Sequence, residues 1–213
     1  MIAKNIQDLF ITMNMCETSL EYAVMFQDFL SKVGHESSEY GVTKIMYETI
    51  KVLCDEFDIK ELTIKQQHTC NEKSIKTSYV NTQHIIYDDT LSSYKMPDGT
   101  FKIFIREPKL DVDTVGDSDM EFINSIAYLE FPDGHKVKLS ELSSEKPDGG
   151  LSEIDTFFSM IDVDVFSEIS KLMKKRLTFI CDSSCDSCEE VFDDYTDEYL
   201  SIILNIFKNI LGN

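Results

Sequence analysis

Residues 43–65 have the sequence TKIMYETIKVLCDEFDIKELTIK, in which the spacing of apolar residues changes from helical to extended. Large apolar side chains first recur every three or four residues, as along one face of a helix: Met46, Ile50, Leu53 and Phe57. Leu62 and Ile64 then alternate with polar residues, which is typical of a strand with one buried face. We therefore predict a helix over residues 42–57 and, directly after it, a first strand.

The flanking sequence predicts another helix and further strands. Residues 17–34 have a broad apolar helix face and end at Gly34, a residue type that readily adopts the left-handed conformation beyond helix ends. Residues 78–87 are rich in β-forming residue types, and the apolar residues of 101–105 alternate. These segments indicate at least two more strands.

The segments Pro97–Gly99 and Pro132–Gly134, both Pro-Asp-Gly, each separate two apolar or β-rich segments. Proline presets φ for the first central residue of a turn, and glycine accepts the positive φ that some turns require. The sequence therefore predicts tight turns at both places and at least one antiparallel hairpin.

The middle of the chain contains an acidic segment, a predicted short helix and a candidate linker. Residues 108–119 predict an acidic loop, and a short helix is expected over residues 118–129 with Ser118 as its N-cap. Residues 140–150, SELSSEKPDGG, are the best candidate for a linker because turn-forming residues dominate them.

The last third of the chain predicts mostly helix. Five turns of helical spacing indicate one long helix over residues 152–176, capped by Ser152, and a last helix is expected over residues 193–211 after a Cys/Asp-rich loop. The wide apolar face of residues 193–211 must be covered by the core, by a dimer partner or by further sequence. A strand is the alternative around three alternating residues: Ile161, Val163 and Val165.

These elements predict an α+β fold, with an antiparallel sheet flanked by N-terminal helices and a long C-terminal helical segment. We expect an α+β domain over residues 1–140 and a helical extension over residues 141–213. The alternative is that both parts pack on one core.

Composition excludes two classes of partner. The chain has 39 acidic and 20 basic residues, and the resulting net charge of −19 repels nucleic-acid phosphates and anionic membranes. No apolar run approaches the ~20 residues of a membrane span, and the N-terminus lacks a signal-peptide cleavage site. We expect a cytoplasmic protein without direct nucleic-acid or membrane contacts, whose surface suits a protein partner with a basic surface.

Cys181, Cys185 and Cys188 form the most suggestive local pattern. Three thiolates at this spacing could hold zinc or another metal, and radical SAM enzymes use the same spacing for an iron–sulfur cluster, but no βα repeats follow to build a barrel. Zinc would need a fourth ligand, from among Cys54, Cys70, His35, His68, His84 and His135. The favoured alternative is free cytosolic thiols, and we expect no cofactor.

Two acidic segments are candidates for cation-binding sites. Asp111–Phe122 aligns with a calcium loop, but Phe122 stands where the bidentate glutamate is required, so a solvated loop is favoured. Asp88 and Asp89 follow a predicted strand without a phosphate-binding glycine loop, so a polar strand end is favoured. His84 is expected to be an ordinary strand residue. Since no catalytic motif is found, we expect a protein that is not an enzyme.

The helix, short turn and strand of residues 43–65 resemble the opening of GAF-like sensory domains. Residues 87–122, which include YKMPDGTFKIFIREP, are similar to N-terminal sensory regions that precede diguanylate cyclase (GGDEF) or EAL modules in bacterial signalling proteins. The resemblance covers about residues 20–130 and implies a C-terminal signalling helix. GAF-like domains share no universal ligand signature, so the resemblance assigns no binding residue.

Two functions follow as the favoured hypotheses, ahead of a third, a metal-dependent enzyme. The first is a non-catalytic ligand-sensing or regulatory module of a bacterial signalling protein, which forms a homodimer through residues 193–211 and has a pocket between sheet and helices. The alternative is an acidic protein–protein interaction factor, such as an inhibitor or a nucleic-acid mimic from a mobile element. Carboxylates arrayed along one face would favour the alternative.

Overall fold

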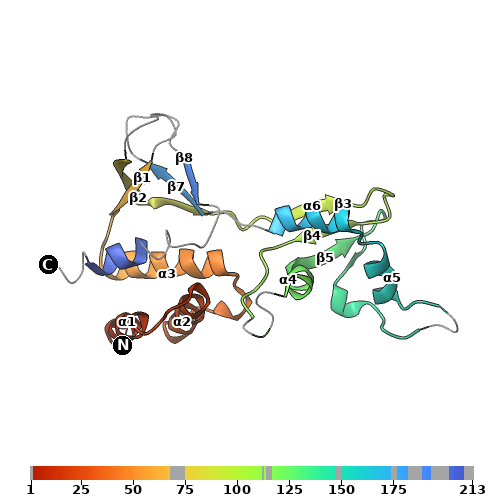
Figure 1. The fold of residues 1–213 in the computed structure, drawn as a ribbon, viewed down its shortest axis with the longest axis horizontal. Coiled ribbons are helices and arrows are strands. Elements are labelled where there is room, and N and C mark those ends of the chain that lie inside the picture. Colours follow the sequence, from red (N-terminus) through yellow and green to blue (C-terminus); the bar gives the residue numbers. More distant parts are fainter. Residues whose placement is uncertain are drawn as a thin grey trace. The chain divides into compact units, whose positions relative to one another are not determined.

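The protein folds into two compact units, seen in a computed structural model (Figure 1). Unit 1 contains residues 1–88 and 176–213, and unit 2 contains residues 89–175, so unit 2 is an insertion in the sequence of unit 1. The residues that the structure describes are 2–67, 75–111, 113, 117–146, 150–173, 177–181, 189–192 and 202–208.

Unit 1 begins with helices: α1 (Ile2–Met13), α2 (Ser19–Lys32), the short 3-10 helix η1 (Ser37–Glu39) and α3 (Val42–Glu56). The helices predicted over residues 17–34 and 42–57 are confirmed as α2 and α3, whereas α1 was not predicted. Helix α2 starts with a reciprocal cap, since the Thr18 hydroxyl accepts a hydrogen bond from the Glu21 amide and the Glu21 carboxylate accepts one from the Thr18 amide. Gly34 follows α2 with φ +97°, as expected of a residue beyond a helix end.

The sheet of unit 1 is antiparallel, in the order β1-β2-β7-β8. Its strands are β1 (Glu61–Gln67), β2 (Ile75–Tyr87), β7 (Leu177–Cys181) and β8 (Glu189–Phe192). The strands predicted near residues 62–64 and 78–87 are confirmed. Strands β7 and β8 occupy part of the segment that was expected to form a Cys/Asp-rich loop before the last helix.

Strand β2 pairs with two partners, and its pairing with β7 shifts register. Val80 lies opposite Cys181, but Ile85 lies opposite Phe179, so β2 contains extra residues between these two pairs. Beyond the shift the pairing is regular as far as Tyr87 opposite Leu177. An irregularity of this kind bends a strand and interrupts its ladder of hydrogen bonds.

The core of unit 1 lies between its helices and its sheet. Contacts join α1 to α2, α2 to α3 and α3 to β2, and the Tyr47 and Tyr87 rings stack with their centroids 5.8 Å apart. Residues 202–208 are helical, and the Phe207 ring lies 5.4 Å from the Phe10 ring. The side chains that are almost fully buried include Phe26, Leu30, Ile45, Ile50, Leu53 and Leu177.

The predicted C-terminal helix falls only partly within the described residues. In residues 202–208 four apolar side chains are buried in this single chain: Ile202, Ile203, Ile206 and Phe207. Leu204 is 37% exposed. For this segment the wide apolar face is therefore core, and those four side chains are not available for a dimer interface.

The sheet of unit 2 is a second antiparallel sheet, in the order β3-β4-β5-β6. Its strands are β3 (Ser92–Lys95), β4 (Lys102–Ile105), β5 (Ile126–Glu130) and β6 (Lys136–Val137). Both predicted Pro-Asp-Gly turns are confirmed as hairpin turns. Gly99 has φ +74° and Gly134 has φ +84°, so each glycine adopts a conformation that L side chains rarely tolerate.

The helix predicted over residues 118–129 is wrong at its end and at its cap. Helix α4 covers Ser118–Ser125, and the chain becomes strand β5 at Ile126 because its apolar side chains pair with β4 across the sheet. The N-cap is Asp117, not Ser118. The Asp117 carboxylate accepts hydrogen bonds from the Asp119 and Met120 amides at 3.1 Å and 3.2 Å.

The single helix predicted over residues 152–176 is also wrong. Two helices occupy this segment, α5 (Glu153–Ser159) and α6 (Val163–Met173). The break falls where Asp162 caps α6, since its carboxylate accepts a hydrogen bond from the Val165 amide at 2.8 Å. The predicted cap of the first helix is confirmed, because the Ser152 hydroxyl accepts a hydrogen bond from the Asp155 amide at 3.1 Å.

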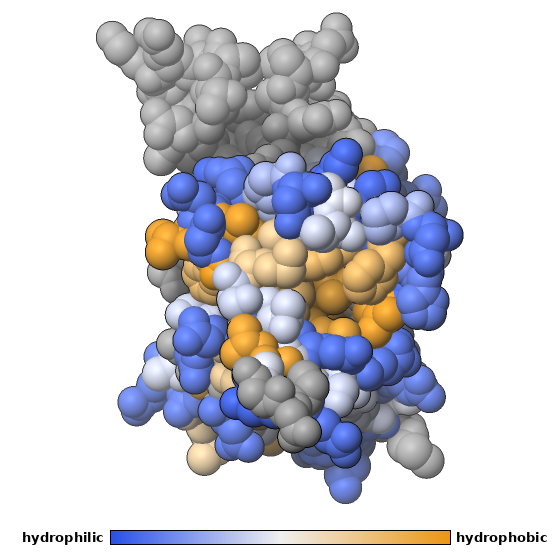
Figure 2. Space-filling view, turned by 90° about the vertical axis from the view of Figure 1, so that its right-hand side faces the viewer, coloured by the Kyte–Doolittle hydropathy of each residue, from blue (hydrophilic) through white to orange (hydrophobic). Residues whose placement is uncertain are grey.

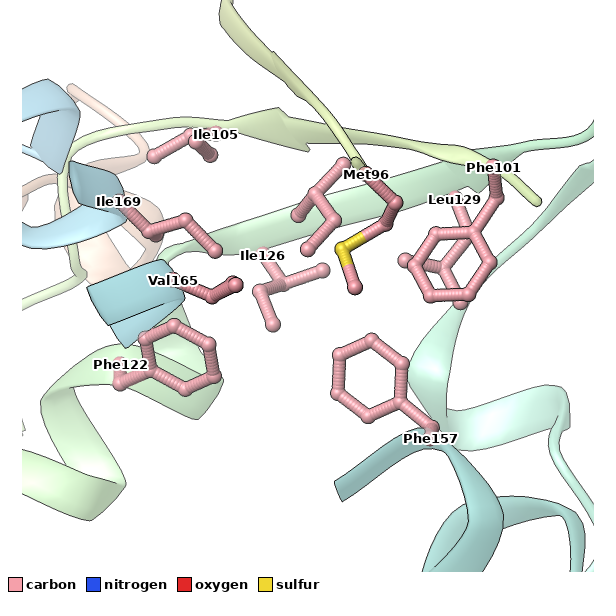
Figure 3. Packing of buried hydrophobic residues seen from close by; sticks show 10 residues of the cluster. Met96, Phe101, Ile105, Phe122, Ile126, Leu129, Phe157, Val165 and Ile169 are labelled. Carbon is pink, nitrogen blue, oxygen red and sulfur yellow. The ribbon is translucent and has the colours of Figure 1, made fainter. Parts of the chain in front are cut away.

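Helices α4, α5 and α6 enclose the core of unit 2 against one face of its sheet (Figure 3). Val165 and Ile169 of α6 point toward the strands beside Ile105 and Ile126, and Phe157 of α5 points toward Met96 and Phe101. The remaining members of the cluster are Ile103, Phe122 and Leu129.

The fold is α+β with antiparallel sheets, as predicted, but the described strands form two sheets instead of one. The units also divide the chain differently from the expected boundary at residue 140. Residues 141–175 belong to unit 2 because Phe157, Val165 and Ile169 share a core with strands β4 and β5.

The two candidate caps of α4 give a first test. We expect Asp117→Ala to lower the free energy of unfolding by about 1 kcal/mol, because two amides of the first turn lose their acceptor. Ser118→Ala is the matched control and should change it by a few tenths at most. Urea denaturation of both variants measures the difference, and equal effects would contradict the assignment of the cap.

The division into units gives a second test. We expect residues 89–175 to fold alone, and unit 1 to fold when an Asn-Gly turn replaces them, because each unit has its own buried core. Circular dichroism and thermal unfolding should show a cooperative transition for each piece. If either piece lacks one, the units depend on each other for folding.

Candidate functional site

An open apolar cleft lies in unit 2, on the side of the sheet where α5 packs. Its volume is about 1040 Å³. Figure 2, viewed from this side, shows apolar residues gathered in a continuous patch that hydrophilic residues border. The apolar side chains that line the cleft are Phe101, Leu129, Phe131, Val137, Leu142, Leu151, Phe157 and Met160.

The floor of the cleft is the core of unit 2 itself. Phe101, Leu129 and Phe157 are nearly buried and belong to the core cluster, and they also line the cleft. The Phe101 and Phe157 rings lie 5.9 Å apart and fix each other in place. The floor is therefore formed by packed side chains of the core.

The cleft exists because two elements at this edge of the sheet are short. Strand β6 has only two residues, and α5 has seven. The longer α6 contacts β3 and β4, and its Val165 and Ile169 share the core with Ile126 at the start of β5. Beyond this core, residues of β5, β6 and α5 line the open cleft.

Three carboxylates lie at the rim of the cleft, those of Asp133, Glu141 and Glu153. Each accepts a backbone hydrogen bond at 2.8–2.9 Å, from the amides of His135, Lys138 and Ser143 respectively. These bonds hold the β5–β6 turn, the 3-10 helix η2 (Leu139–Glu141) and the start of α5 in fixed positions. The rim therefore carries fixed negative charges.

The ammonium group of Lys136 is held away from the floor of the cleft. Lys136 pairs with Glu130 in the sheet, and Glu130 faces the opposite side from Leu129 because successive strand residues alternate. Lys136 Nζ lies 3.6 Å from a Glu130 carboxylate oxygen, donates a hydrogen bond to the Tyr128 hydroxyl and sits 4.7 Å from the Tyr128 ring centre. The Tyr128 hydrogen bond is the main cause that raises the pKa of Lys136.

A second cation near α5 is paired as well. Lys146 Nζ lies 3.3 Å from an Asp155 carboxylate oxygen. The Ser152 hydroxyl and the Lys146 ammonium together lower the pKa of Asp155 below its ordinary value. The Lys146 ammonium thus balances the negative charge of the Asp155 carboxylate. The hydrogen bonds described above for the three rim carboxylates come from uncharged backbone amides.

The cysteine motif falls mostly outside the described residues. Cys181 is the last residue of β7, whereas Cys185 and Cys188 lie outside the described part of the chain. Within the described part, no group of three or more His, Cys, Asp or Glu side chains could hold a metal ion. The predicted metal site therefore stays a prediction.

The described residues that were considered as a fourth metal ligand belong to no group that could hold a metal ion. Cys54 is buried in α3, and burial is the main cause that raises the pKa of its thiol to about 12. His35 Nδ1 lies 4.0 Å from a Glu48 carboxylate oxygen in unit 1, and His84 is exposed in β2. His135 is exposed at the rim of the cleft in unit 2. Cys70 and His68 lie outside the described residues.

The two acidic segments have structural roles where they are described. Phe122, at the position where a calcium loop needs its glutamate, is only 2% exposed and belongs to the core of unit 2. Asp111 accepts a hydrogen bond from the Asp113 amide, which is a local turn. Asp88 and Asp89 are exposed and follow the end of β2.

Comparisons with known protein families, with curated proteins and with solved structures found no match to this chain. Among the described residues, no helix has both the length and the apolar character needed to cross a bilayer.

Sequence reasoning missed the cleft residues because each has an ordinary role in a core or a turn. One signal was present at Asp162. An acidic residue inside a long helical pattern, next to the alternating residues around Ile161, is consistent with a new helix start. That break would have shown that α5 is too short to cover the sheet.

The buried thiol of Cys54 gives a third test. Its pKa is raised in the folded protein, so its contribution to stability is complete below the ordinary pKa near 9 and is lost as pH rises toward about 12. We expect the free energy of unfolding to fall more between about pH 8 and about pH 10 in the wild type than in Cys54→Ala. Urea denaturation at both pH values measures this, and parallel pH dependence in the two proteins would contradict the assignment.

Proposed function

We propose that the protein is a non-catalytic binding module whose ligand places an apolar group in the cleft of unit 2. The observation that carries this proposal is the cleft of about 1040 Å³ with its aromatic floor. Binding sites are typically concave, lined mainly by apolar and aromatic side chains, and about 300–1,000 Å³ in volume. The cleft has this lining, and its volume is slightly above that range.

The polar groups of the cleft suit binding better than chemistry. The carboxylates of Glu141 and Glu153 accept backbone hydrogen bonds that shape the rim, which is a positioning role. General acid–base catalysis would instead need a side chain that can exchange a proton with a bound substrate. These hydrogen bonds give Glu141 and Glu153 a role in shaping the cleft, which agrees with a binding function.

We include in the proposal the regulatory role that follows from the resemblance to GAF-like sensory domains. A sensory module needs a ligand site and a second element that responds to it. The cleft of unit 2 is the proposed ligand site, and the sheet of unit 1, which receives both ends of unit 2, is the proposed responding element.

A second candidate function is the acidic interaction factor. The net charge of −19 and the three carboxylates at the rim of the cleft favour it. The two functions share one site, since a protein partner with a basic surface could use the same cleft as its point of attachment.

The cleft gives a fourth test, with the uncharged fluorescent probe Nile red. We expect its emission to increase and shift to the blue on binding to the full chain, because the cleft offers an apolar surface open to solvent. Leu151→Asp should weaken the signal several-fold, since Leu151 lines the cleft and is 57% exposed.

The matched control is Val163→Asp, because Val163 is 83% exposed and does not line the cleft. It should leave Nile red binding unchanged. If Leu151→Asp binds the probe as well as Val163→Asp does, the cleft is not the binding site.

A further inference from the structure

We propose that the cleft of unit 2 binds a basic segment of a partner protein, in which large apolar side chains are flanked by lysine or arginine. This inference rests on the proposed function and names the chemistry of the ligand. It depends on two properties of the cleft, its apolar surface at the solvent boundary and the charges on its rim.

The apolar surface extends from the floor of the cleft to its outside edge. Phe157 on the floor is 3% exposed, Leu151 on the wall is 57% exposed, and Phe158 beside Phe157 on α5 is 37% exposed. The centres of the Phe157 and Phe158 rings lie 5.2 Å apart, so the aromatic surface continues from the cleft over α5. A single small molecule in the cleft would leave this outer apolar surface in water, whereas a protein segment would cover it.

The charges on the rim of the cleft favour a ligand that carries positive charge. Asp133, Glu141 and Glu153 are fixed at the rim by backbone hydrogen bonds. Among the described residues that line the cleft, the basic ones are Lys136 and His135, and the Lys136 ammonium is held by Glu130 and Tyr128. The rim therefore presents more negative than positive charge to an incoming ligand.

An anionic amphiphile, such as a fatty acid, would bring its carboxylate to this acidic rim and be repelled. A basic segment would gain attraction from the rim and from the −19 charge of the whole chain, which steers association at low salt. Complementary charge at the edge of an apolar contact sets specificity and the association rate, while the buried apolar side chains provide most of the affinity.

The test uses the full chain and two synthetic amphipathic peptides of equal length, one built from leucine and lysine and one from leucine and glutamate. Fluorescence anisotropy measures binding of each labelled peptide. We expect saturable binding of the Leu/Lys peptide, which weakens as salt increases, and no binding of the Leu/Glu peptide.

Variants distinguish binding of the peptide in the cleft from non-specific electrostatic attraction of the peptide to the acidic surface. Leu151→Ser should weaken binding of the Leu/Lys peptide about tenfold or more, since it removes an apolar contact without adding a charge. Glu141→Gln with Glu153→Gln should weaken it at low salt by a few-fold, because glutamine keeps the oxygen acceptor and loses the charge. The matched control is Asp119→Asn with Glu168→Gln, two exposed positions of unit 2 that do not line the cleft.

The outcomes distinguish this inference from the proposed function. If Nile red enters the cleft but the Leu/Glu peptide binds as well as the Leu/Lys peptide, or neither binds, the inference fails and the binding module stands. If the control pair weakens the Leu/Lys peptide as much as the rim pair does, binding is unspecific attraction and the inference also fails. If the Leu/Lys peptide does not respond to Leu151→Ser and Nile red does not respond to Leu151→Asp, both proposals fail.

Discussion

The antiparallel pairing of β2 with β7 is the constraint on which the two-unit architecture depends. Tyr87 and Leu177 lie opposite each other at one end of this pairing, and the whole of unit 2 is the connection between them. Because paired strands are only about 5 Å apart, both ends of the insertion must leave unit 1 at one place. A unit attached in this way can have its own sheet and core without interrupting the sheet that carries it.

Local signals allowed much of the fold to be predicted. Helices α2 and α3 follow from the spacing of their apolar residues, and the two Pro-Asp-Gly turns follow from the φ angles that proline and glycine accept. Strands β7 and β8 and the end of α4 were not predicted, because their conformation is decided by pairing with strands elsewhere in the chain. Pairing of this kind leaves little trace in a short window of sequence.

The candidate site could not be predicted from the sequence for a related reason. Its floor uses Phe101, Leu129 and Phe157, which come from three separate segments of the chain and whose side chains resemble those of any core. Only the packing of a seven-residue helix beside a two-residue strand turns these core residues into the floor of a cleft. The acidity of its rim was visible in the sequence only as a general excess of charge.

The same pairing of β2 with β7 has a consequence for the order of folding. Two strand ends that are distant in sequence lose considerable chain entropy when they meet, and this loss grows with the length of the connection. The contacts of unit 2 are closer in sequence, and a folded unit 2 acts as a short, stiff link between Tyr87 and Leu177. Formation of unit 2 before this pairing would therefore reduce the chain entropy that is lost when the sheet of unit 1 closes.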